Sequence, residues 1–114
     1  MSFRESDILI TTAQELSGYK IVEVKGVVIG ITVRSRGLGG NIVASFRSLV
    51  GGEIKEYVEM AEQARIQALE RMIERAKALG ANAVINVRFD SNELAQNMDE
   101  IIAYGTAVVV TKSI

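Results

Sequence analysis

The sequence has no cysteine, no histidine and no proline among its 114 residues. Without cysteine and histidine the chain excludes disulfide bonds, thiol nucleophiles, the usual zinc sites and any catalytic triad that needs an imidazole. Average composition would supply about six prolines, so a proline-bearing linker is excluded as well. A chain of this length is one domain, which we place at residues 1–114. The missing groups predict that it is not an enzyme.

Charge is nearly balanced, with 13 basic and 14 acidic residues and a net charge of −1. Nothing in that balance attracts the phosphates of a nucleic acid or an anionic membrane surface. No apolar run approaches the roughly 20 residues of a membrane helix, and residues 1–6 do not resemble a signal peptide. We expect a soluble cytoplasmic protein with no nucleic-acid or membrane partner.

The first two-thirds of the chain predicts a long strand and then two helices. Residues 19–33 are rich in Val and Ile and alternate in polarity at their start, which favours a strand. Residues 41–50 fit a short helix that begins at an asparagine and ends before two glycines. Residues 53–79 predict a long helix with glutamates early, basic side chains late and Gly80 after its last turn.

The last third predicts a hairpin. Residues 83–90 alternate between apolar and polar, and residues 101–111 return as a strand that is apolar on both sides. With the first long strand they form a three-stranded antiparallel sheet, and the long helix covers one of its faces. The predicted fold class is therefore α+β in two layers, with the short helix preceding the long one.

Apolar side chains occur on both faces of this sheet, although one helix can cover only one face. From Val27 onward the first strand is apolar on both sides. On the long helix, Ile66 and Ile73 fall roughly 80–100° away from the main apolar stripe. That stripe comprises Ile54, Val58, Ala61, Leu69, Met72, Ala76 and Leu79. Monomers seldom expose such patches, so we expect a homo-oligomer with closed cyclic symmetry.

Three arginines are candidate binding residues. Arg65 falls within the apolar stripe, where it must meet a carboxylate, carbonyl oxygens or a ligand anion. A structural ion pair with Asp90 or Glu23, or a place at a subunit seam, competes with anion binding. Arg34 and Arg36 begin a glycine-rich loop that either presents N–H groups to an anion or is a solvated connection. The spacing fits neither a P-loop nor a dinucleotide fingerprint.

Acidic residues gather near the predicted hairpin turn, at Asp90, Glu93, Asp99 and Glu100. Their oxygen atoms suit a hard cation such as Ca²⁺ or Mg²⁺. No spacing fixes such a site, and acidic hairpin ends are commonly just solvated. We therefore assign no metal site and no cofactor.

Three blocks of residues, taken in order, resemble one known family. They are Gly51–Gly52 with Tyr57, Ala64–Arg65 and Ala68; then Ala78 to Val84 running on to Asp90; then Gly105 to Val108. Together with the apolar run at residues 8–12 and the glycine-punctuated first strand, these blocks resemble the YbjQ-like family of small bacterial and archaeal proteins. The likeness covers essentially the whole chain.

The resemblance implies a dodecin-like subunit, three antiparallel strands with a long helix, that assembles into a ring-shaped homopentamer. The family carries a heavy-metal-binding label, against which the missing thiolate and imidazole ligands of this chain argue. Tyr57, Arg65 and Asp90 match the family's polar positions. With Arg34 and Arg36 they are our candidate ligand-contacting or inter-subunit residues.

The sequence thus predicts a non-enzymatic cytoplasmic homo-oligomer, pentameric by resemblance, that acts as a structural or small-ligand-binding module. Its partner is a second copy of itself, together with an unidentified small ligand. The alternative is a metal-ion- or anion-binding module that uses oxygen donors or arginines.

Overall fold

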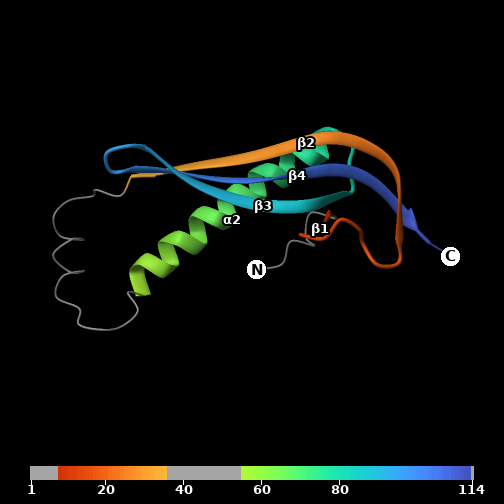
Figure 1. Ribbon diagram of the computed structural model, residues 1–114, viewed down its shortest axis with the longest axis horizontal. Helices are drawn as coiled ribbons and strands as arrows, with labels where there is room; N and C mark the ends of the chain where they lie inside the picture. Colours follow the sequence, from red (N-terminus) through yellow and green to blue (C-terminus); the bar gives the residue numbers. More distant parts are fainter. Residues whose placement is uncertain (1–7, 36–54, 114) are drawn as a thin grey trace.

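The computed structural model describes residues 8–35 and 55–113, with four strands and one helix among them (Figure 1). In chain order these are β1 (Leu9–Ile10), β2 (Tyr19–Ser35), α2 (Lys55–Ala78), β3 (Ala83–Ala95) and β4 (Met98–Lys112). The helix crosses one face of the sheet obliquely (Figure 1). Side chains are described for all of these residues except 35 and 55–57.

The sheet has four strands in the order β1-β3-β4-β2 and is mixed. The prediction of a three-stranded antiparallel sheet is therefore wrong. β1 adds a fourth strand that runs parallel to β3, with Leu9 opposite Ala83 and Ile10 opposite Val84. A strand of two residues is too short for periodicity to reveal its partner. The short helix predicted at 41–50 lies outside the described residues, and α2 is the only helix within them.

The main core lies between α2 and the sheet. The residues of this cluster with the largest share in the contact are Val28, Ala68, Leu69, Met72, Ile73, Ala76, Val84, Val87, Ala103 and Ala107. Ile73, which the sequence placed on a separate patch, is 4% exposed, whereas Leu79 of the predicted stripe is 45% exposed. Both predictions were wrong because the buried stripe of α2 lies closer to its alanines than hydrophobicity alone indicates.

The close packing of α2 on β2 explains that shift. A Cβ atom at Gly30 would overlap the carbonyl oxygen of Ala68 and the amide nitrogen of Met72. Backbone meets backbone here, so small residues must face the strand. The helix passes the sheet only from Ala64 onward, and residues 59–63 are exposed.

The connection from α2 to β3 follows the predicted helix end. Gly80 has φ +83°, the left-handed conformation of a residue that follows a helix. Its amide donates to the Lys77 carbonyl at 2.9 Å, and the Ala81 amide donates to the Ala76 carbonyl at 3.0 Å. These bonds satisfy carbonyls that the last helical turn leaves free.

A second, smaller cluster covers part of the opposite face of the sheet. It contains Ala83, Ile85, Val108 and Val110, with Leu9, Leu16 and Tyr19 packed against it. The segment before β2 is held there by Arg88, whose Nη1 donates to the Thr12 carbonyl at 2.8 Å. This cluster buries only the end of the sheet near Tyr19.

Candidate functional site

The rest of the sheet face turned away from α2 is apolar and uncovered. Because Val28 and Thr32 are buried under the helix, alternation turns their neighbours to the other side. On β2 these neighbours are 71% exposed at Val27 and 45% exposed at Val33, with Ile29 and Ile31 between. Opposite them on β4 lie the partly exposed Ile102 and Tyr104. We call Val27, Ile29, Ile31, Val33, Ile102 and Tyr104 the uncovered face.

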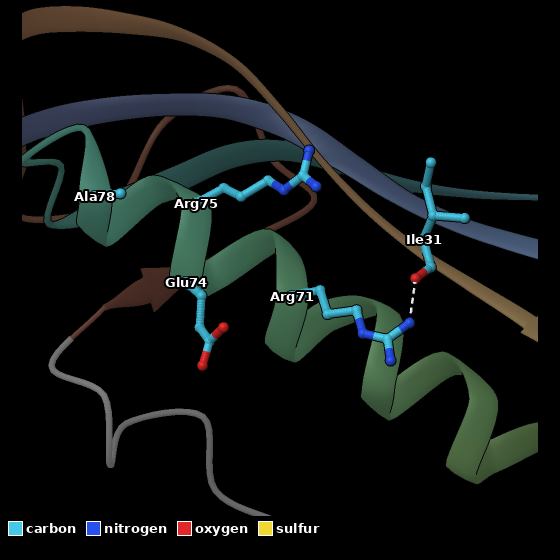
Figure 2. Close-up of a pocket in the computed structure, with 5 residues that line it drawn as sticks. All are labelled: Ile31, Arg71, Glu74, Arg75 and Ala78. Atoms are coloured by element: carbon cyan, nitrogen blue, oxygen red, sulfur yellow. Dashed lines mark hydrogen bonds between the residues drawn. The ribbon is translucent and has the colours of Figure 1, made fainter.

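A groove of about 500 Å³ lies where α2 passes the outer edge of β2, and we call it the arginine groove. It is lined by Ile31, Arg71, Glu74, Arg75 and Ala78 (Figure 2). Nη1 of Arg71 donates to the Ile31 carbonyl at 2.6 Å, so the arginine occupies a free acceptor of the edge strand. Arg75 extends from α2 in the same direction (Figure 2) and forms no hydrogen bond or ion pair with any described residue.

The sequence did not single out Arg71 and Arg75. Their spacing of four residues puts both on one helix face, where like charges repel by a few tenths of a kcal/mol. That unfavourable pair was the available signal. Only the tertiary structure shows that the same face borders the edge of β2.

Arg34 lies at the end of β2 and is partly buried. Its Nη2 donates to Oε1 of Gln67 at 3.2 Å, and the hydroxyl of Thr32 donates to the same oxygen at 3.4 Å. The Nε of Arg34 is buried and has no acceptor among the described residues. A buried donor without an acceptor is costly and can be satisfied by an anion.

Arg65 is exposed, so its predicted burial in the apolar stripe is wrong. Its guanidinium lies 5.6 Å from the ring centroid of Phe89, within range of a cation–π contact. Phe89 faces the helix side, so the next residue, Asp90, lies on the opposite face of β3. Arg65 and Asp90 are therefore not brought together. Glu23, the other predicted partner, pairs with Lys25 at 2.9 Å.

The remaining candidates are not tested by these contacts. The backbone of Tyr57 belongs to α2, but its side chain lies outside the described residues, as does the whole of Arg36. Asp90 is exposed on β3. The five predicted site residues thus do not form one cluster in the part of the chain that is described.

The described residues do not provide a metal centre. No group of three or more Asp, Glu, Cys or His side chains within residues 8–35 and 55–113 could hold an ion. Nor does any helix in those ranges have the length and apolar character needed to span a membrane.

These features define a class before any comparison: a small α+β domain with an open apolar sheet face and an arginine-lined edge. A family model described as "putative heavy-metal-binding", the YbjQ family, matches residues 8–111. The chain belongs to this family, as the sequence resemblance predicted.

Relatives support the assignment across archaea and bacteria. The chain is 96% identical over 114 residues to a UPF0145 protein of Sulfurisphaera tokodaii, covering 100% of both chains. It is 58% identical over 105 residues to a UPF0145 protein of Thermoplasma acidophilum, covering 92% of this chain and 88% of that one. A UPF0145 protein of Bradyrhizobium is 50% identical over 106 residues, with coverage of 93% and 96%.

A solved structure shares the fold. It is a protein of unknown function from Pediococcus pentosaceus, of the DUF74 family, with a TM-score of 0.63 and 18% identity. The match covers 91% of this chain and 98% of that one. At this identity the likeness establishes the fold alone.

The family's description does not fit the donor atoms of this chain. Heavy metals of soft or borderline character bind thiolate and imidazole, and the sequence has neither cysteine nor histidine. The described carboxylates form no cluster that could substitute for those ligands.

Proposed function

We propose that this protein is a non-enzymatic cytoplasmic homo-oligomer, a pentameric ring by family resemblance, that acts as a structural or small-ligand-binding module. The observation that carries the proposal is the uncovered face of β2 and β4. Val27 at its centre is 71% exposed, and Ile29, Ile31 and Val33 are each more than a third exposed.

The physical argument is the free energy of hydrating that face. Burying apolar surface contributes about 25 cal/mol for each Å² removed from water. Isolated monomers rarely leave contiguous apolar patches of this kind in solvent. A second copy of the chain is always present at matching concentration, and closed cyclic assembly covers the face on every subunit.

The experiment is native mass spectrometry and sedimentation velocity of the full chain. We expect one closed oligomer, and bound small molecules would add reproducible mass to it. Val27→Lys places a charge on the uncovered face and should shift the protein toward monomer. The control is Met60→Lys on α2, where Met60 is 38% exposed, and it should leave the assembly intact. A wild-type monomer at micromolar concentration would refute the proposal.

A second candidate function is binding of a small anion at Arg34. Its support is the buried Nε that lacks an acceptor among the described residues. Titration with inorganic phosphate should then give saturable heat that Arg34→Gln abolishes. Absence of heat with the wild-type protein would remove this candidate without affecting the oligomer.

A further inference from the structure

The two long sides of the sheet carry opposite charge. On one side, α2 places Arg71 and Arg75 along the outer edge of β2. On the other side, β3 from Phe89 to Ala95 contains two acidic residues and no basic residue, and all seven are exposed. We call the segment Phe89–Ala95 the acidic edge.

The acidic edge has no strand beside it among the described residues. β1 pairs with β3 only at Ala83 and Val84. Backbone bonds from the segment before β2 continue the cover only to Val87, whose amide donates to the Thr11 carbonyl at 3.0 Å. From Phe89 onward β3 pairs with β4 on its inner side alone. A free edge of this length is a site at which another chain can dock.

The arginine groove and the acidic edge lie at the same height along the sheet. Ile31, which lines the groove, is opposite Ile102 of β4. Ile102 is in turn opposite Asp90 of β3. A neighbouring copy placed side by side, with its strands roughly parallel, therefore brings its Asp90 level with the groove.

Charge that is unpaired within one subunit is present on both sides. Arg75 forms no ion pair with a described residue, and neither does Asp90. Because each copy has one groove and one acidic edge on opposite sides, the contact between them is head-to-tail. Contacts of that kind close into a ring when the rotation between copies allows it.

We propose that the arginine groove of one subunit receives the acidic edge of the next, with Asp90 of the second copy completing the site beside Arg75. This inference rests on the proposed oligomer and specifies one of its contacts. The uncovered face supplies apolar burial, whereas the groove fixes which side of a neighbour can approach. Paired charges at an interface serve this orienting role and disfavour wrong partners.

The test uses charge reversal in the full chain. Arg75→Glu and Asp90→Arg each place like charges together at every contact and should weaken association at least about tenfold. The double variant Arg75→Glu/Asp90→Arg restores opposite charges in a swapped order. It should recover most of the lost association, as measured by sedimentation velocity over a range of protein concentrations.

Lys77→Glu is the matched control. Lys77 and Arg75 are both basic residues of the last helical turn, so the two reversals have a similar effect on the helix dipole. Two residues along a helix is a rotation of about 200°, which turns Lys77 away from the groove. Lys77→Glu should leave association unchanged, and thermal melting should show that all variants are folded.

The outcomes separate this inference from the proposed function. An oligomeric wild type whose association is unaffected by Arg75→Glu, or a double variant no better than the single ones, overturns the inference and leaves the oligomer standing. A monomeric wild type overturns both. If Arg75→Glu abolishes binding of inorganic phosphate while assembly is unchanged, the groove serves a small anion and the inference is wrong.

Discussion

Asn82 shows how one side chain can extend a sheet. Its Nδ2 donates to the Val110 carbonyl at 2.9 Å, and its Oδ1 accepts from the Val110 amide at 2.8 Å. The side chain thereby imitates a strand residue just before β3 begins. This contact gives a physical reason for the asparagine in the block that runs from Ala78 to Val84.

Asn82→Ala should lower the free energy of unfolding by about 2 kcal/mol, because both backbone groups of Val110 lose their partner. The control is Asn92→Ala, which removes one exposed contact with Glu100 at 3.4 Å and should cost less than about 0.5 kcal/mol. Urea unfolding at a fixed protein concentration measures both. Equal effects of the two substitutions would contradict the role assigned to Asn82.

The packing of α2 on β2 depends on one position without a side chain. At Gly30 the strand and helix backbones approach so closely that an added Cβ would meet main-chain atoms of Ala68 and Met72. Main-chain atoms in a helix cannot move aside as a flexible side chain can. The contact therefore explains both the glycine in the strand and the alanines on the buried helix face.

Gly30→Ala should destabilise the protein by about 3 kcal/mol, since the helix must move off the sheet to admit the methyl group. Gly80→Ala provides a comparison in which the same atom is added at a position with φ +83° and only the flexible end of Lys25 nearby. That change should cost only about 1 kcal/mol of backbone strain. A smaller loss for Gly30→Ala than for Gly80→Ala would show that the close approach is not limiting.

The whole molecule offers no donor set for a soft metal. We expect titration with Zn²⁺ or Cd²⁺ to give no saturable heat and no rise in Tm, because a bound ligand would stabilise the folded state by mass action. Thiolate and imidazole are absent from the entire chain. Saturable binding at a fixed ratio of metal to subunit would show that carboxylates from several copies converge in the assembly.

The elements of the fold could be predicted from the sequence, because they follow from local patterns. The observed helix at Lys55–Ala78 and the strand at Tyr19–Ser35 lie close to the predicted ranges. Gly80 was recognisable as the residue after the helix, since a left-handed conformation favours glycine. Strand alternation also showed that the sheet has two apolar faces, and this observation led to the proposed oligomer.

Only the tertiary structure decided which residues meet. It added β1 to the sheet, buried Ile73, exposed Arg65 over Phe89 and separated Arg65 from Asp90. It also placed Arg71 and Arg75 at the edge of β2. Local periodicity fixes the type of each element, whereas these relations depend on the angle at which α2 crosses the sheet. That angle is set by backbone contact at Gly30, which no pattern within the helix or the strand alone contains.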